Sequence, residues 1–206
     1  MPRFVDHVQR RREIADALLS IVAQEGIYGV TIRAVAARAE WSTGVINHYF
    51  RDRHDLLLGG LRRAAEVAAE RQKVIGQTMI GRQALEAVLE ENLPLDSRRL
   101  ALSRIFVFFY AEACVDPAVR LEIDGYLRGW RRQTEVTLRA AQECGDIDPS
   151  LDPVLTAIEL VGLADGLGVH ALFNDDVLER LRSSSSVRTW VNRLARQPAD
   201  SATTTS

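Results

Sequence analysis

The sequence predicts an all-α fold. Apolar residues recur three and four positions apart through nearly every segment, which is the period of an amphipathic helix. No segment alternates β-branched residues with polar ones, and no Asn-Gly turn occurs that would join two strands. Most of the six prolines lie at the ends of the periodic segments. We therefore expect about nine helices in 206 residues, a length that allows one large domain or two small ones.

The N-terminal third contains four predicted helices. The first covers residues 8–25, where Ile14, Leu18 and Ile21 share one face, and Gly26 ends it. Serine, threonine and aspartate often cap the start of a helix, because their side-chain oxygens accept hydrogen bonds from unpaired backbone amides. Such caps at Thr31, Ser42 and Asp52 predict helices over residues 31–38, 42–48 and 53–74.

Five more helices are expected downstream. Asp116-Pro117 and Asp152-Pro153 each join a capping aspartate to a proline at the first helical position, where no backbone donor is needed. These predicted helices cover residues 82–92, 96–114, 117–144, 151–173 and 177–196. The tail, residues 197–206, is small and polar without apolar periodicity, so we expect it to be disordered.

Charge is distributed unevenly along the chain. The net charge is −2, but residues 1–73 carry +3 and the remainder carries −5. A basic N-terminal part has the sign expected of a surface that meets phosphates. The N-terminus lacks the apolar core of a signal peptide, and we expect no membrane-spanning segment and a cytoplasmic location. Cys114 and Cys144 form no CxxC pair and are interpreted as reduced thiols, with a redox-sensing pair as the alternative.

Residues 31–57 have the pattern of a helix-turn-helix followed by a capped third helix. Val35 and Ala39 are expected to face inward, with Trp41, Ile46 and Tyr49 packing across the turn. Small and polar side chains are left facing outward, where they can reach bases and phosphates. The outward set is Thr31, Arg33, Thr43, Gly44, Asn47 and His48.

These residues resemble a known family. The segment Ser42–Phe50, followed by Arg53 and Asp55–Leu57, resembles the signature of TetR-family transcriptional repressors, and Thr31–Ala36 is similar to the preceding family motif. The resemblance implies a three-helix DNA-binding domain with the helix-turn-helix and a helical ligand-binding and dimerisation domain. We place these domains at residues 1–52 and 53–196.

The segment also departs from the family pattern. Glu40 replaces a usual glycine of the turn, and a positive φ there would cost about 1 kcal/mol. Asn47, Tyr49 and Arg53 replace a common tyrosine, histidine and lysine. Because asparagine can form two hydrogen bonds to adenine, the operator sequence cannot be transferred from relatives.

The resemblance assigns roles within the DNA-binding segment. Expected phosphate contacts come from Arg33, Ser42, Thr43, Tyr49 and Arg53. Gly44 would allow close backbone approach, and Asn47 and His48 would contact bases. The alternatives are simple packing for His48 and Tyr49, and a solvated surface charge for Arg33.

The middle of the chain is rich in aromatic residues, which by themselves indicate a buried helix. Residues 108–120 and 159–173, however, are similar to the C-terminal domain of the choline-responsive repressors of betaine synthesis, and the resemblance implies a ligand cavity. Aromatic faces and carboxylates can hold a cation, so we expect a cationic or amphipathic inducer. The alternative for Glu112 and Asp165 is a salt bridge to an arginine. Candidate ligand-binding residues are Phe106, Phe109, Tyr110, Glu112, Tyr126, Trp130 and Asp165.

The last two predicted helices are expected to form a homodimer, since paired reading heads on a two-fold axis match a palindromic operator. The expected contact stripe is Val154, Ala157, Ile158, Val161, Ala164, Asp165 and Gly168. The last helix would add Leu178, Leu181, Val187, Trp190, Val191 and Leu194. An ordinary core within one chain is the alternative for both sets.

The predicted function is a DNA-binding repressor released from double-stranded operator DNA by a small molecule. A regulator without an inducer and an activator are the alternatives. No GxSxG, P-loop, HExxH or GxGxxG motif supports an enzyme built on Cys114, Asp165 and His170, and no catalytic residue, cofactor or metal site is expected.

Overall fold

The computed structural model describes residues 6–184 and 186–195, and this part of the chain is almost entirely helical. It contains no strand, apart from one isolated antiparallel bridge between Ile147 and Ala195. The all-α prediction is therefore confirmed. The helices are α1 (His7–Glu25), a 3-10 turn η1 (Ile27–Gly29), α2 (Ile32–Arg38), α3 (Thr43–Tyr49), α4 (Arg53–Thr78), α5 (Gly81–Glu90), α6 (Ser97–Ala113), α7 (Pro117–Glu143), α8 (Pro153–Phe173), α9 (Asp175–Ser183) and α10 (Ser186–Arg193).

Side-chain caps set most of these boundaries. The predicted caps Thr31, Ser42 and Asp52 accept hydrogen bonds from the backbone amides of α2, α3 and α4. Asp116 and Asp152 do the same ahead of Pro117 and Pro153. The local sequence therefore determines where these helices begin.

The prediction of one last helix over residues 177–196 was wrong. Asn174 caps α9, which ends at Ser183, and a separate helix α10 starts at Ser186. Serine hydroxyls compete for backbone hydrogen bonds, and Ser183 Oγ donates to the Glu179 carbonyl oxygen at 2.7 Å. The predicted tail, 197–206, lies outside the described residues.

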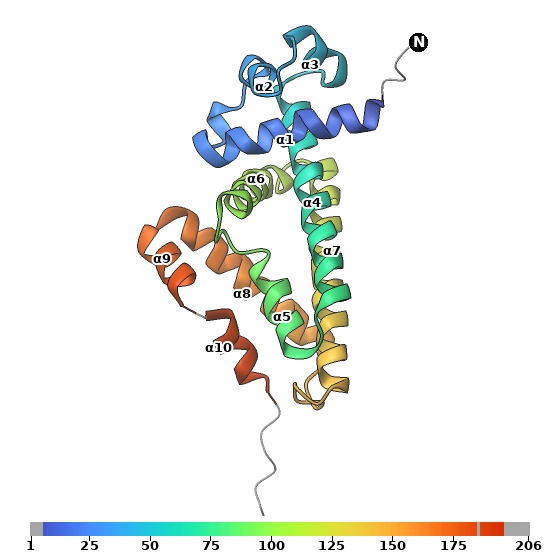
Figure 1. Cartoon of the computed structure of the whole chain (residues 1–206), viewed down its shortest axis with the longest axis vertical. Helices are drawn as coiled ribbons and strands as arrows, with labels where there is room; N and C mark the ends of the chain where they lie inside the picture. Colours follow the sequence, from blue (N-terminus) through green and yellow to red (C-terminus); the bar gives the residue numbers. More distant parts are fainter. Residues whose placement is uncertain (1–5, 185, 196–206) are drawn as a thin grey trace, which may run out of the picture.

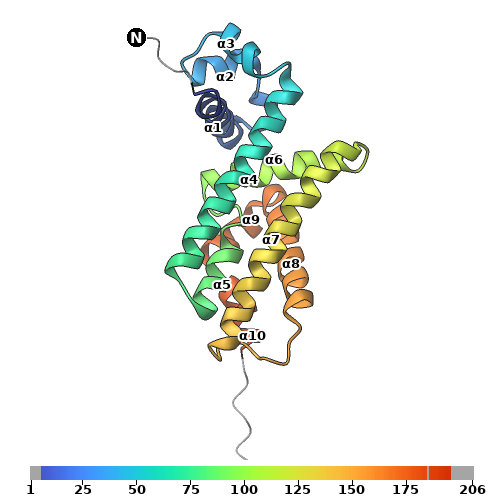
Figure 2. The same ribbon diagram turned by 90° about the vertical axis from the view of Figure 1, so that its right-hand side faces the viewer.

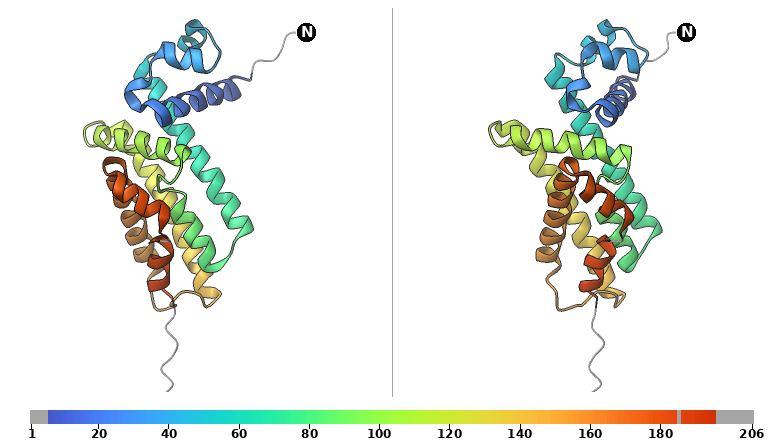
Figure 3. Two further views of the ribbon diagram at one scale, coloured as in Figure 1. Left: turned by 60° about the vertical axis from the view of Figure 1, so that its left-hand side comes forward. Right: turned by 90° about the vertical axis from the view of Figure 1, so that its left-hand side faces the viewer.

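The helices divide the molecule along its length (Figure 1). The first three helices form one end, and α4 runs from there along the body to α5. Helix α7 extends along the same body, as a second view shows (Figure 2). Helices α8, α9 and α10 lie along another side, below the projecting corner where α6 meets α7 (Figure 3). Helix α6 crosses the body directly beneath α1.

Two clusters of buried apolar residues hold the fold together. The first joins α1, α2, α3 and the first half of α4 to α6 and the start of α7, and includes Leu18, Phe50, Ile105 and Phe109. The second joins α5, the end of α7, α8 and α10. The first cluster contains residues from both sides of position 52, where we had expected one domain to end. Helix α6 therefore belongs to the same packed unit as the helix-turn-helix.

A close helix crossing at Gly60 makes this shared core possible. A Cβ atom at Gly60 would lie 2.5 Å from Leu18 Cδ2 of α1 and 2.9 Å from Ile105 Cδ1 of α6. Arg104 of α6 also donates to the carbonyl oxygens of Val22 and Ala23, at 2.9 and 2.8 Å. Because these carbonyls belong to the last turn of α1, the guanidinium acts as a cap for that helix.

Helix α8 is long and apolar enough to span a membrane by length and composition alone. Its buried residues, including Ala157, Leu160 and Ala164, nevertheless pack into the second cluster. Asp165 lies near its middle and accepts a hydrogen bond from Tyr110. The helix therefore has the features of a core helix that leaves one apolar side exposed.

We predict that Gly60→Ala destabilises the protein by about 1–3 kcal/mol, because the added methyl overpacks the crossing of α1, α4 and α6. In an unconstrained helix, the same change stabilises by about 0.5–1 kcal/mol. Gly76→Ala in α4 is the control, since its Cβ would lie 3.8 Å from Gln133 Nε2, an ordinary contact distance. Urea unfolding at a fixed protein concentration measures both effects. A stabilising Gly60→Ala would show that the crossing is not tight.

Candidate DNA interface and ligand cavity

The predicted DNA-binding residues lie on α2, α3 and their caps, at one end of the molecule, except Arg53, which begins α4 (Figure 1). Thr31 Oγ1 accepts from the Ala34 amide at 3.0 Å, and Ser42 Oγ accepts from the Val45 amide at 3.3 Å, so both residues begin their helices. Seven of the nine predicted residues are exposed, namely Thr31, Arg33, Ser42, Thr43, Gly44, Asn47 and His48. The polar face that the sequence predicts is therefore available to a ligand.

Tyr49 connects this face to the first turn of α1. Its ring is half-buried, and its hydroxyl lies 3.1 Å from Nδ1 of His7. The His48 ring meets the Tyr49 ring edge-on, with centroids 5.1 Å apart. Tyr49 thus packs as well as facing the surface, and it brings His7, a residue that the sequence did not indicate, to the edge of α3.

Arg53 has a different role from the predicted phosphate contact. Its Nε and Nη2 atoms donate to the carbonyl oxygens of Val30 and Ile27, each at 2.7 Å. The guanidinium is thereby directed into the connection between α1 and α2. We conclude that Arg53 positions the helix-turn-helix from inside the domain.

The turn between α2 and α3 contains the one non-glycine residue with positive φ among the described residues. Glu40 has φ of 58°, as expected if it replaces a glycine. The turn also places the Trp41 amide 2.9 Å from the Ala36 carbonyl oxygen. The position therefore requires a left-handed backbone, and glutamate adopts it at an energetic cost.

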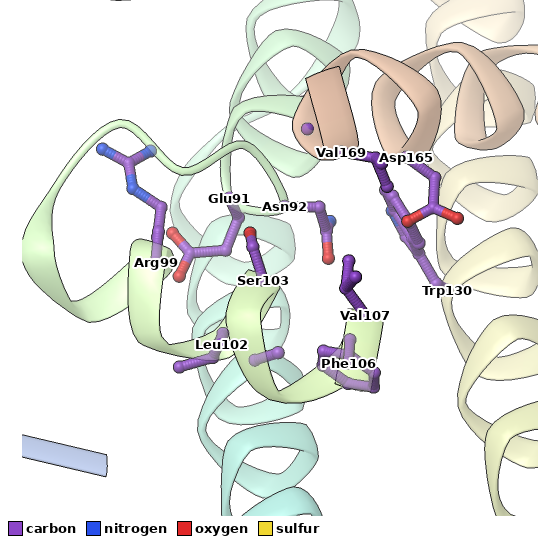
Figure 4. A pocket seen from close by; sticks show the side chains of 12 residues that line it. Glu91, Asn92, Arg99, Leu102, Ser103, Phe106, Val107, Trp130, Asp165 and Val169 are labelled. Carbon is purple, nitrogen blue, oxygen red and sulfur yellow. The ribbon is translucent and has the colours of Figure 1, made fainter. Parts of the chain in front are cut away.

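A small cavity lies between α4, α6, α7 and α8 (Figure 4). Its volume is about 50 Å³, enough for a few water molecules. Phe106, Trp130 and Asp165, three of the predicted ligand residues, line it. Figure 4 shows Asp165 and Trp130 next to each other. The sequence did not indicate the other polar side chains of its wall, Glu91, Asn92, Arg99 and Ser103.

Asp165 is the unpaired charge of this cavity. Its Oδ1 accepts a hydrogen bond from the Tyr110 hydroxyl at 3.1 Å, and no described arginine, lysine or histidine forms an ion pair with it. Burial raises the pKa of Asp165, and the Tyr110 hydrogen bond offsets part of that rise. Burial, with the adjacent carboxylate, also raises the pKa of Tyr110. Among the described residues, Asp165 thus forms no salt bridge to an arginine, which was the alternative interpretation.

Two aromatic residues, Phe106 and Trp130, line the cavity. The Trp130 indole Nε1 is buried and has no hydrogen-bond partner among the described residues. The Phe106 ring packs edge-on against Tyr126, with centroids 5.8 Å apart. Burial, more than the nearby Glu122 carboxylate, raises the pKa of Tyr126 to about 12, so this phenol stays neutral. Besides Glu91 and Arg99, the cavity wall therefore presents the Asp165 carboxylate and the aromatic side chains of Phe106 and Trp130.

A wider groove between α4 and α7 adjoins the cavity. It has a volume of about 490 Å³ and shares Ala68, Asn92 and Trp130 with the cavity wall. Tyr126, another predicted ligand residue, lines this groove. Gly125 and Gly129 on α7 leave its floor without side chains, and a Cβ at either would meet nothing within 4 Å. In the sequence, this groove is marked by two glycines four residues apart, the second of which precedes Trp130.

Three predicted ligand residues, Phe109, Tyr110 and Glu112, do not line either space, although Tyr110 donates a hydrogen bond to Asp165 of the cavity wall. Phe109 is completely buried in the first core cluster. Glu112 forms a hydrogen bond with His54 in the first turn of α4. Phe109 and Glu112 both contact the ring of His54 at the start of α4, so they lie toward the helix-turn-helix end.

The predicted dimer stripe also needs correction. Ala157, Val161, Ala164 and Gly168 are buried within the chain, where they contribute to packing of α8. On the last helices, Leu181, Val187 and Val191 are buried as well. Val154 and Ile158 of the predicted stripe are exposed, and Leu155 and Leu163, which were not predicted, complete the exposed apolar side of α8.

Comparison with known proteins identifies the family. Residues 14–59 match the bacterial regulatory proteins of the tetR family, and residues 81–196, more than half of the chain, match the C-terminal domain of BetI-type transcriptional repressors. The chain belongs to the TetR family. It is a transcriptional regulator of the BetI type, which confirms the predicted resemblance and the expectation that it is not an enzyme.

Individual relatives agree with this assignment over most of the chain. The regulator is 27% identical over 205 residues to the HTH-type transcriptional regulator BetI of Escherichia coli K12, covering 94% of this chain and 97% of that protein. It is 26% identical over 176 residues to PksA of Bacillus subtilis, covering 84% of each. A transcriptional regulator from Saccharomonospora viridis, solved in complex with choline, has the same fold, with a TM-score of 0.74 and 24% identity over 90% of this chain and 95% of that one.

We predict that Glu40→Gly stabilises the regulator by about 1 kcal/mol, because glycine adopts the positive φ without a Cβ clash. For a domain of this size, the melting temperature should rise by roughly 2–4 °C. Ala39→Gly is the matched control: its φ is −83°, so glycine there only adds unfolded-state entropy and should destabilise. Equal effects of the two changes on thermal melts would contradict the strain at Glu40.

We predict that Asp165→Asn stabilises the ligand-free regulator near neutral pH by about 1 kcal/mol, because it removes a buried charge that lacks a cation. A raised carboxyl pKa means that the native state binds the proton more tightly than the unfolded state does. The carboxylate therefore costs stability above that pKa, and the advantage of asparagine should shrink as pH falls towards it.

Thermal melts at several pH values measure this difference. Asp124→Asn is the control, because Asp124 already pairs with Arg128 at 3.0 Å on the surface of α7 and should gain nothing from losing its charge. A destabilised Asp165→Asn at neutral pH would argue that the carboxylate has a cationic partner.

Proposed function

We propose that this regulator is a homodimeric, cytoplasmic repressor that binds a palindromic operator and is released from it by a cationic small molecule. The observation that carries the ligand class is the Asp165 carboxylate, which is largely buried beside aromatic rings and paired only with a neutral hydroxyl. A buried carboxylate without a cation is unfavourable, and a cationic ligand would relieve that cost.

The contrast with Glu91 supports a cation at Asp165. Glu91 lines the same cavity, but its carboxylate already pairs with Arg98 at 2.5 Å and Arg71 at 3.3 Å. Arg99 of the wall is similarly paired with Asp96 at 2.8 Å. Asp165 therefore supplies the uncompensated charge, and the faces of Trp130 and Phe106 can add cation–π attraction.

A quaternary ammonium alcohol fits this chemistry. Its cationic head would pair with Asp165 among the rings, and its hydroxyl could accept the unused N–H of Trp130. The cavity is too small for such a head as it stands, so binding would widen it towards the groove between α4 and α7. The similar regulator from S. viridis was solved with choline, which supports the same ligand class here.

DNA binding is proposed for the exposed faces of α2 and α3. Asn47 and His48 would contact bases, Arg33, Ser42, Thr43 and Tyr49 would contact phosphates, and Thr31 and Gly44 would lie against the backbone. Two copies would read the two halves of a palindrome, about 34 Å apart. We retain residue 52 as the functional boundary between the DNA-binding domain and the ligand-binding and dimerisation domain, although the first core cluster contains residues from both sides of it.

The proposed dimer surface is the exposed side of α8. Leu155, Ile158 and Leu163 are 53%, 47% and 42% exposed, which is unusual for large apolar side chains on one helix face. Gly162 and Gly166 lie on the same helix, and a Cβ at either would meet nothing within 4 Å. A second α8 can therefore approach closely at these glycines.

The proposed release mechanism is a shift between two arrangements of the dimer. Pairing of a cation with Asp165 would change the hydrogen bond from Tyr110, which lies on α6. Because α6 packs directly against α1, a movement of α6 would change the distance between the two DNA-binding domains of the dimer. The ligand acts only if it binds the released arrangement more tightly.

The test combines operator selection with ligand release. Wild-type protein should select a palindrome from random DNA, and choline should lower its operator affinity in a fluorescence-anisotropy titration. Asp165→Asn should keep operator binding but lose the choline response, whereas the surface control Asp124→Asn should keep both. Selected DNA that no quaternary ammonium compound releases from wild-type protein would favour a regulator without such an inducer. A protein that selects no DNA would overturn the proposal itself.

A further inference from the structure

The start of α1 and the recognition helix α3 together form a concave surface that we call the α1–α3 concavity. It is open to solvent and has a volume of about 630 Å³. Among the described residues, one arginine and two histidines line it, and no acidic side chain does. Its lining residues are His7, Arg10, Trp41, Ser42, Gly44, Val45, His48 and Tyr49.

Arg10 is held in place by an aromatic ring. Its guanidinium carbon lies 3.7 Å from the centroid of the Trp41 ring. Its one ion pair among the described residues is with Glu13, at 3.7 Å from Nε on the exposed helix surface, and such a pair is weak. The two terminal nitrogens make no hydrogen bond within the described chain. The guanidinium is therefore held in one orientation while its terminal N–H donors stay free for a ligand.

His7 is held in place by Tyr49. Its Nδ1 lies 3.1 Å from the Tyr49 hydroxyl, and its ring centroid is 6.1 Å from that of His48. The Tyr49 hydroxyl can donate to a neutral imidazole or accept from a protonated one. Protonation of His7 therefore adds a positive charge beside α3 without losing this contact.

We propose that the first turns of α1 belong to the DNA-binding surface, where His7 and Arg10 contact the phosphate backbone that flanks the recognition helix. The proposal rests on the proposed operator binding and extends it to residues that precede the matched family segment, 14–59. The occupant is inferred from charge complementarity, since the α1–α3 concavity contains cationic and imidazole groups and continues the exposed face of α3.

Operator affinity would then depend on pH. A phosphate favours the protonated form of an imidazole, so affinity should rise as pH falls. Among the described residues, the charged and titratable groups beside His7 are Arg10 of α1 and His48 and Tyr49 of α3, and Asp6 precedes it as the cap of α1. The Asp6 carboxylate is already bonded to the amides of Val8 and Gln9, at 3.0 Å each.

The first experiment measures the salt dependence of operator affinity by fluorescence anisotropy. Arg10→Ala should lower the slope of log Kd against log salt by about 1, whereas Arg10→Lys should retain it. Arg12→Ala is the matched control, because it removes the same charge from the same helix, but Arg12 pairs with Glu66 of α4 at 3.1 Å. Arg10→Gln serves in place of Arg10→Ala if melting curves show that the alanine variant is unfolded.

The second experiment measures the pH dependence. Wild-type affinity should rise by roughly three- to tenfold from about pH 8 to about pH 6. His7→Gln should lose part of this rise, and the double change His7→Gln with His48→Gln should lose the remainder. His170→Gln, at an exposed position in the last turn of α8, is the control that should leave it unchanged, once its oligomeric state is shown to match that of the wild type.

The outcomes separate this proposal from operator binding itself. If wild-type protein binds its selected operator but Arg10→Ala and Arg12→Ala share the wild-type slope, Arg10 is not in the interface. If His7→Gln keeps the full pH dependence, His7 only supports Tyr49. If wild-type protein selects no operator, the proposed function fails before either variant is compared.

Discussion

The close crossing of α1, α4 and α6 at Gly60 is the constraint on which the rest of the structure depends. Because a Cβ there would lie 2.5 Å from Leu18 and 2.9 Å from Ile105, only glycine lets the three helices meet without displacement. The crossing merges the helix-turn-helix with α6 in one core. Arg104 strengthens the link by capping the last turn of α1. Helix α6 therefore both borders the cavity and packs against α1 at the DNA-binding end.

The two faces of α6 explain how one helix serves both ends. Phe106 lines the cavity and Tyr110 donates to Asp165 of its wall, while Phe109 and Glu112 contact His54 near the DNA-binding end. Close-packed interiors deform little, so a shift of the cavity face must also move the opposite face. The same geometry explains Arg53, whose guanidinium is bonded to the turn before α2, where it keeps the reading helices in a fixed position.

The predictability of each feature depended on whether its cause is local. Caps such as Thr31, Asp116 and Asp152 act on amides two or three residues away, so the sequence located them. The positive φ at Glu40 was likewise a property of a short turn. The aromatic run of α6 is apolar on all sides, and periodicity therefore could not separate cavity-facing Phe106 from core-facing Phe109. Helix α8 posed the same problem, and its buried and exposed apolar sides were assigned the wrong way round at Ala157 and Val161.

Asp165 shows why a site can conflict with the stability of its own fold. Glu91 lies in the same cavity wall and is compensated by two arginines, so the chain has the means to neutralise a buried carboxylate. Asp165 receives only the Tyr110 hydroxyl, and its pKa is raised as a result of burial. Local departures from a well-satisfied interior are typically found where a protein binds something. A cation that pairs with Asp165 would remove this cost and at the same time act on Tyr110 of α6. In the proposed mechanism, the unpaired charge would thus both select the ligand and couple its binding to the helix that contacts α1.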